Sequence, residues 1–289
     1  MSGTTDRRSS RLLWLRTVSE RGQRHEPVRP QMLPAIAGGA VIGILGGLIG
    51  LGGAEFRLPL LINYFRFAPL ESVILNKAIS LVVVASAFLF RGWIIPFGSI
   101  ADAWPIITNL LAGSLVGAWV GAGVATRLDS TTLRRLIAVM LVGIACILLF
   151  AHSPSLSVGS TPIGLGQAIA GVFLGFLIGI VASILGVAGG ELLIPTLVLL
   201  FDVDIRLAGS LSLAVSLPTM LTGLTRYSRS QSFLVIGKNR EFVFAMVAGS
   251  LTGTFIGANL LGIVPQSVLL PALAAILVIS AIKTWGHSK

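Results

Sequence analysis

Two short sequences in this chain combine glycines, a carboxylate and a proline in the same order. The first is GLGGAEFRLP at residues 50–59, and the second is GVAGGELLIP at residues 186–195, which lies 136 positions further on. We call them the first and the second glycine motif. Glycine and proline interrupt helices, and both motifs lie between apolar stretches. Matched breaks of this kind indicate ligand-binding sites in membrane proteins built from two repeats.

The chemistry that suits these motifs is the binding of a small anion. The first N–H groups of a helix have no intrahelical partners, and the helix dipole adds partial positive charge there. Glycines just before a helix let a ligand approach the backbone without a side chain in the way. We therefore expect anion contacts at Gly50, Gly52, Gly53, Ala54, Gly186, Gly189 and Gly190.

Arg57 occurs in the first motif only, because Leu193 stands at its position in the second. An arginine can bind an oxyanion through two parallel hydrogen bonds. The alternatives are an internal pair between Arg57 and a carboxylate, or a side chain that extends to the membrane surface.

Small polar side chains follow each motif, near the start of the next long apolar segment. They could contact the same ligand, although hydroxyl groups in membrane helices commonly bond to the backbone instead. Asn76 is the strongest of them, since a buried amide needs partners and Ala208 replaces it in the second repeat. The residues concerned are Asn76, Ser80, Ser210 and Ser212.

Each motif also places a glutamate at the first turn of the expected helix. Glu55 and Glu191 could cap these helices, because a carboxylate is favourable at a helix start. They are also candidates for proton coupling, since a carboxyl group at membrane depth could exchange a proton during transport. Pro59 and Pro195 are expected to end or kink the two helices.

The elements that carry these motifs are those of an all-α polytopic membrane protein. The chain has 289 residues, 54% of them hydrophobic and 11% charged, with a mean hydropathy of +0.93. Soluble domains carry about 25% charged residues. We predict ten apolar segments, at about 33–50, 55–67, 72–91, 104–126, 133–151, 164–185, 190–201, 206–227, 241–261 and 267–285.

Segments 55–67 and 190–201 are shorter than the others. Twelve helical residues extend over roughly 18 Å, whereas the hydrocarbon core is about 30 Å thick. We expect these two segments to be broken or re-entrant helices that begin at the glycine motifs. If all ten segments cross, five in each half make two inverted repeats; if the short ones re-enter, fewer crossings remain.

Further similarity supports a duplication with repeats at residues 33–151 and 164–285. GSLVGAWVGA at 113–122 matches GSLTGTFIGA at 249–258 at six of ten positions, again with a shift of 136. Glycines four residues apart lie on one helix face and allow close helix packing. Such faces could pack within one chain or in a homodimer equally well.

The net charge of +10 does not indicate nucleic acid, because of where the basic residues lie. Seven arginines precede the first apolar segment in residues 1–32, which we expect to be a disordered cytoplasmic tail near membrane lipid. Further basic residues gather in alternate loops, which predicts that both termini are cytoplasmic. These residues are Arg127, Arg134, Arg135, Arg226, Arg229, Lys238 and Arg240.

The duplicated pattern Gly-x-Gly-Gly-Gly-x-x-x-x-Pro resembles that of the TauE/SafE sulfite exporter family, over about residues 33–285. Ala54 replaces the third glycine of the triplet in the first motif, and Ala188 replaces the first in the second. The resemblance implies a permease of the bacterial inner membrane that moves small sulfur-containing anions such as sulfite, sulfonates or sulfoacetate, generally outward.

We therefore predict a secondary transporter of a small anion that works by alternating access and is coupled to protons. An anion channel, or an importer of a small organic anion, is the alternative. We expect no enzyme activity, cofactor or metal site, because the three histidines are isolated and no catalytic constellation is visible.

Overall fold

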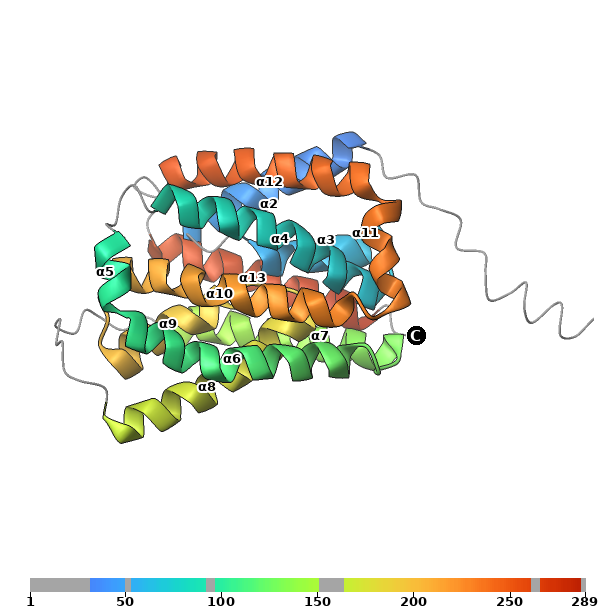
Figure 1. Cartoon of the computed structure of the whole chain (residues 1–289). Coiled ribbons are helices and arrows are strands. Elements are labelled where there is room, and N and C mark those ends of the chain that lie inside the picture. Colours follow the sequence, from blue (N-terminus) through green and yellow to red (C-terminus); the bar gives the residue numbers. More distant parts are fainter. Residues whose placement is uncertain (1–31, 50–52, 92–96, 151–163, 261–265, 287–289) are drawn as a thin grey trace, which may run out of the picture. The chain divides into compact units, whose positions relative to one another are not determined.

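The computed structural model describes residues 32–49, 53–91, 97–150, 164–260 and 266–286, and all regular structure in these ranges is helical (Figure 1). The first half holds α2 (Met32–Ile49), α3 (Ala54–Asn63), α4 (Pro69–Arg91), α5 (Phe97–Asp102), α6 (Trp104–Ala125) and α7 (Ser130–Phe150). The second half holds α8 (Leu165–Leu185), α9 (Gly190–Phe201), α10 (Ile205–Tyr227), the 3₁₀ helix η1 (Gln231–Phe233), α11 (Leu234–Lys238), α12 (Arg240–Leu260) and α13 (Gln266–Gly286). The predicted tail at residues 1–32 lies outside the described residues, except for Met32.

The all-helical membrane fold is confirmed, and each of the ten predicted apolar segments forms a helix. Within the described residues, four helical stretches are long and apolar enough to cross a membrane: Pro69–Leu89, Trp104–Ala125, Leu165–Leu185 and Leu207–Tyr227. The short helices α5 and α11 were not predicted. The inverted relation of the two repeats stays a prediction.

The helices that follow the glycine motifs are as short as the sequence predicts. α3 has 10 residues and α9 has 12, and each begins directly after a glycine in the left-handed conformation. These glycines are Gly53, with φ 68°, and Gly189, with φ 80°. Residues with a side chain rarely adopt this backbone conformation. Glycine at these two positions therefore allows the turn from which each short helix starts.

Pro59 and Pro195 lie inside α3 and α9 and do not end them. The two helices continue to Asn63 and Phe201, respectively. A proline removes the hydrogen bond to the carbonyl group four residues earlier, and here that carbonyl belongs to Glu55 or Glu191. Because only the first turn loses a bond, the helix can continue past the proline.

Glycine-rich faces join the two repeats. α2 packs along α12, and α6 packs along α8, so each pair takes one helix from each half. A Cβ atom on Gly39 of α2 would lie 2.5 Å from the carbonyl oxygen of Met246, and one on Gly175 of α8 would lie 2.5 Å from that of Leu110. In this structure the repeated glycines therefore serve packing within one chain.

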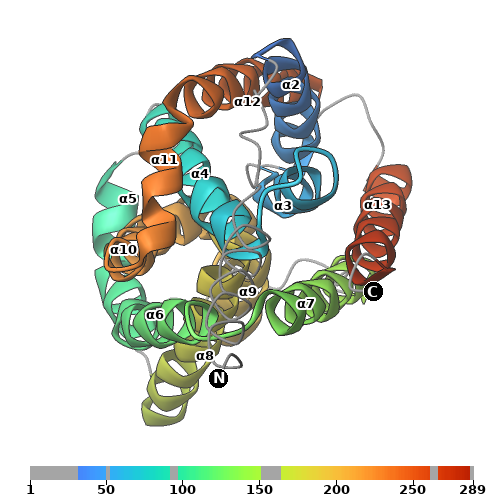
Figure 2. The same ribbon diagram turned by 90° about the vertical axis from the view of Figure 1, so that its right-hand side faces the viewer.

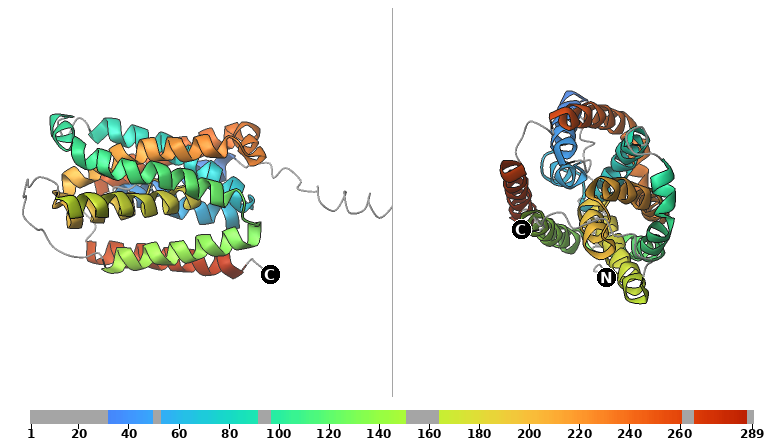
Figure 3. Two further views of the ribbon diagram at one scale, coloured as in Figure 1. Left: turned by 60° about the horizontal axis from the view of Figure 1, so that its bottom comes forward. Right: turned by 90° about the vertical axis from the view of Figure 1, so that its left-hand side faces the viewer.

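The glycine motifs occupy the interior of this helical region. Figure 2 looks along the long helices, and α3 and α9 lie inward of the α2–α12 and α6–α8 pairs. α7 and α13 pack side by side at one edge (Figure 3). Nearly all of α3 is buried, including Glu55 and Arg57.

Candidate functional site

Arg57 is a fully buried cation. All its hydrogen-bond acceptors among the described residues are neutral. Its exposed fraction is 0%. Nη1 donates to Ser80 Oγ at 2.9 Å and to Asn76 Oδ1 at 3.4 Å, and Nη2 donates to Ser250 Oγ at 3.1 Å. The Nε–H group has no partner among the described residues. We call Arg57, Asn76, Ser80 and Ser250 the Arg57 cluster.

Two elements bring the predicted members of this cluster together. Arg57 projects from the second turn of α3, and Asn76 and Ser80 lie four residues apart on one face of α4. Glu55 is close enough for its charge to act on Arg57, but the hydrogen bonds of the guanidinium group go to the amide and hydroxyl oxygens.

Asn76 connects the surroundings of both glycine motifs. Its Nδ2 donates to the carbonyl oxygen of Ala54 at 3.0 Å and to that of Leu185 at 3.2 Å. Ala54 belongs to the first motif, and Leu185 directly precedes the second. The Leu185 carbonyl is at the end of α8, where intrahelical donors are missing, so the amide satisfies an otherwise unpaired group.

We predict that Asn76→Leu destabilises the protein by about 3 kcal/mol, because it leaves a buried carbonyl group and part of the Arg57 guanidinium unsatisfied. Thermal unfolding of the purified protein in detergent measures the loss. Asn259→Leu is the matched control, since Asn259 is exposed and bonds only to the carbonyl of Phe255 in its own helix. Equal melting temperatures for the two variants would contradict this role of Asn76.

The two motif glutamates contact each other. Glu55 is 2% exposed and Glu191 5% exposed, and their carboxyl groups share a side-chain hydrogen bond. Each carboxyl group also accepts from its own backbone N–H, as a helix cap does. An ionised carboxylate only accepts, so the hydrogen bond between the two requires a proton on one of them.

The remaining predicted residues lie at or near the motifs, without joining the Arg57 cluster. Gly50 and Gly52 lie outside the described residues. Gly186 ends α8 with φ 67°, and Gly190 begins α9. Ser212 Oγ donates to the backbone carbonyl of Gly209 at 2.9 Å, which is the structural alternative considered for these serines. Ser210 Oγ is buried and has no partner among the described residues.

Further buried polar residues near the motifs were not among the predicted site residues. One is Ser216, whose Oγ donates to the carbonyl oxygen of Ala188 at 2.8 Å. Ser250 comes from the glycine-rich repeat of α12, and the Gly-Ser pair that opens both copies of that repeat was the available signal. Lys77 is 0% exposed and follows Asn76 in α4. A lysine in the middle of an apolar segment is itself a signal, because a charge at membrane depth is costly.

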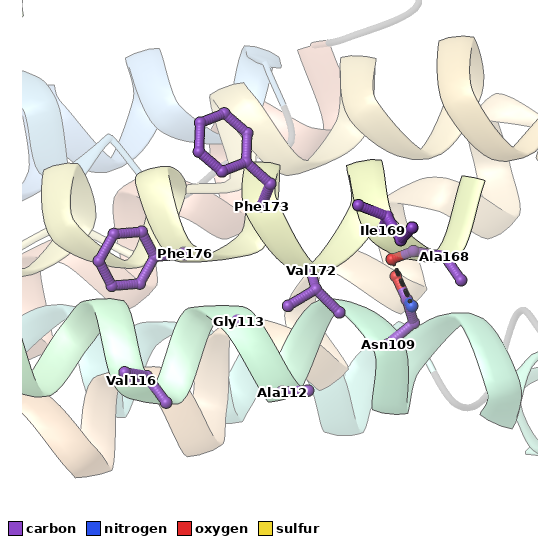
Figure 4. Close-up of a pocket in the computed structure, with 9 residues that line it drawn as sticks. All are labelled: Asn109, Ala112, Gly113, Val116, Ala168, Ile169, Val172, Phe173 and Phe176. Carbon is purple, nitrogen blue, oxygen red and sulfur yellow. Dashed lines mark hydrogen bonds between the residues drawn. The ribbon is translucent and has the colours of Figure 1, made fainter. Parts of the chain in front are cut away.

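The hollow of about 590 Å³ between α6 and α8 is not at the motifs. Figure 4 shows its lining, with Val116 on α6, with Val172, Phe173 and Phe176 on α8, and with Asn109 Nδ2 donating to the Ala168 carbonyl at 2.9 Å. The lining is largely apolar, as expected of a surface that meets lipid tails. Within the described ranges, no three His, Cys, Asp or Glu side chains are grouped so that they could hold a metal ion.

Comparison with known proteins gives one match. The sequence profile described as sulfite exporter TauE/SafE matches residues 35–284, a range that contains both glycine motifs and the Arg57 cluster. No curated protein and no solved structure matches the chain. Because the profile extends over most of the sequence, the chain belongs to the TauE/SafE sulfite exporter family, a family of membrane transporters and not of enzymes.

Proposed function

We propose that this protein is a secondary transporter that moves small oxyanions such as sulfite, sulfonates or sulfoacetate, generally outward, and that Arg57 binds the anion. The observation that supports this most is the buried guanidinium group with only neutral hydrogen-bond acceptors. Removing one charge from water costs several kcal/mol, and a bound anion would offset that cost. The unused Nε–H and an Nη–H are suited to a bidentate oxyanion contact.

The two short helices support the same site. Their starts at Gly53 and Gly189 carry the positive end of the helix dipole, and Asn76 connects both regions. The motif glutamates accept from their own N–H groups in this structure, so an anion would reach the helix starts once the carboxyl groups turn away. Gly50, Gly52, Ala54, Gly186, Gly190, Ser80 and Ser210 are the further residues that we assign to this binding region.

Alternating access between inverted repeats is our proposed mechanism. α3 and α9 are equivalent helices of the two repeats, and their glutamates share one hydrogen bond that requires a proton. A movement that separates the motifs would break this contact and allow the proton to leave. We place the protein in the bacterial inner membrane with both termini in the cytoplasm, as its basic loops favour.

The test of this function is flux in proteoliposomes that contain the purified full chain. We expect saturable movement of radiolabelled sulfite or sulfoacetate that empty liposomes do not show. Unitary currents without saturation would favour an anion channel. A folded protein that moves none of these anions in either direction would disprove the proposal.

Glu191→Gln is expected to uncouple anion flux from the proton gradient while leaving anion binding intact. The glutamine amide can still donate a hydrogen bond to Glu55, but it cannot take up or release a proton in the relevant pH range. The measurement is sulfite flux with and without an imposed pH gradient, which should accelerate the wild type and not the variant. Glu241→Gln, at an exposed position of α12, is the control. A variant that keeps the acceleration by the gradient would exclude Glu191 from coupling.

A further inference from the structure

Lys77 is a second buried cation that the proposed function does not use. It lies in α4, directly after Asn76, and its exposed fraction is 0%. Its Nζ donates to Ser183 Oγ of α8 at 3.3 Å. An ammonium group has three donors, and this is its one hydrogen bond among the described residues.

The residues around the ammonium group include a small polar side chain and a glycine. Ser183 is also 0% exposed, and its carbonyl oxygen accepts from the Tyr227 hydroxyl at 2.8 Å. At Gly223 of α10, a Cβ atom would lie 2.8 Å from both Lys77 Nζ and Ser183 Oγ. Glycine at position 223 therefore leaves the room that the Lys77 ammonium group and the Ser183 hydroxyl occupy.

The charge of Lys77 has no carboxylate partner in the part of the chain that the structure describes. Ser183 is in the last turn of α8, so the negative end of that helix dipole faces the ammonium group. This dipole amounts to about half an elementary charge and leaves part of the lysine charge uncompensated. A bound anion would compensate the charge that remains.

Arg226 of α10 and Arg57 of α3 are cations on helices that pack against α4. Arg226 is three residues after Gly223, on the same part of α10, and its guanidinium lies over the ring of Trp119 at 5.2 Å. Lys77 is next to Gly223, and Asn76, the neighbour of Lys77, bonds to Arg57.

We infer that Lys77 and Ser183, which lie against Gly223, form a second binding position for a small oxyanion, separate from the Arg57 cluster. The ammonium group supplies charge-assisted hydrogen bonds, and the Ser183 hydroxyl can donate to the same anion while it accepts from Nζ. The choice of a small oxyanion rests on the proposed function, whereas the position rests on the geometry of Lys77.

Equilibrium dialysis of the purified full chain with radiolabelled sulfite tests this position. We expect Lys77→Gln to weaken one of the binding equivalents at least ~10-fold, since it loses a charge-assisted contact, and to leave the other unchanged. Arg57→Gln should affect the other equivalent. Lys238→Gln, at an exposed position of α11, is the control and should bind as the wild type does.

The outcomes separate this inference from the proposed function. A folded Lys77→Gln protein with wild-type stoichiometry and affinity, whatever its melting temperature, would show that Lys77 only balances the end of α8, and would overturn the inference alone. If Lys77→Gln loses a binding equivalent and Arg57→Gln binds sulfite as the wild type does, the inference is supported and the role of Arg57 is refuted. A wild type that binds no sulfite would overturn both.

A measurement on the wild type covers the case in which Lys77→Gln does not fold. Selenite, the selenium analogue of sulfite, can be located in crystals by its anomalous scattering. We expect a selenium peak beside the Lys77 ammonium group, close enough for a selenite oxygen to accept a hydrogen bond from Nζ. A peak at the Arg57 cluster only would overturn the second position and keep the first.

Discussion

Arg57→Gln should weaken the binding of sulfite-like anions roughly 100-fold and abolish their flux, which is the largest functional effect we expect of a single substitution. Glutamine has two N–H donors and can replace part of the hydrogen bonding to Asn76, Ser80 and Ser250, so the protein should fold. It cannot supply a positive charge or the two parallel donors that an oxyanion accepts. The same change also removes a buried charge that has no carboxylate partner among its hydrogen bonds, so the variant should not be less stable than the wild type.

The measurement is a thermal-shift titration of sulfite and sulfoacetate, together with flux in proteoliposomes. A ligand that binds the folded state raises the melting temperature, and this rise should disappear in Arg57→Gln. Arg127→Gln is the matched control, because Arg127 is exposed after the end of α6. Arg57→Lys should retain part of the binding, since lysine keeps the positive charge but lacks the two parallel N–H donors of a guanidinium group. An undiminished shift in Arg57→Gln would remove Arg57 from the site.

Gly175→Leu should be strongly destabilising although it leaves the site untouched. The Cβ atom alone would lie 2.5 Å from the Leu110 carbonyl oxygen in the backbone of α6, which cannot rotate away as a side chain can. The leucine must therefore push α8 and α6 apart along a contact that joins the two repeats. Overpacking of this kind costs about 3 kcal/mol, and we expect a clear fall in the melting temperature in detergent.

Gly166→Leu, in the same helix, is the control for this prediction. Nothing lies within 4 Å of a Cβ atom at position 166, and leucine has a higher helix propensity than glycine. Its melting temperature should equal or exceed that of the wild type. If both variants melt at the wild-type temperature, the close contact of α6 and α8 is not needed for stability.

Much of the fold was predictable because membrane helices are long and apolar, and because each one is specified by residues that are close together in the sequence. Each of the ten segments matches a helix, with boundaries that differ by at most a few residues. The short helices α5 and α11 were not predicted, since 6 and 5 residues are too few for a pattern to appear. Tertiary context forms them where the chain turns between longer helices.

The candidate site was predictable only in part. Arg57, Asn76 and Ser80 stood out as polar residues next to a break, and α3 and α4 bring them together. Ser250 was not foreseen, although its hydroxyl accepts from Arg57, because the two residues are 193 positions apart. Ser212 donates to a backbone carbonyl of its own helix, a contact that composition does not reveal, and its contact with a ligand stays a prediction.

The sequence by itself determined that this is a helical membrane protein with a sequence repeat and a short helix at the glycine motif of each half. Apolar length, glycine breaks and repeat spacing can all be read directly from the order of the residues. The tertiary structure alone decided which partners the buried charges have. It gives Arg57 neutral acceptors, pairs Glu55 with Glu191, and surrounds Lys77 with Ser183 and Gly223. These contacts join α3, α4, α8, α9, α10 and α12, and they depend on how closely the glycine faces let those helices approach.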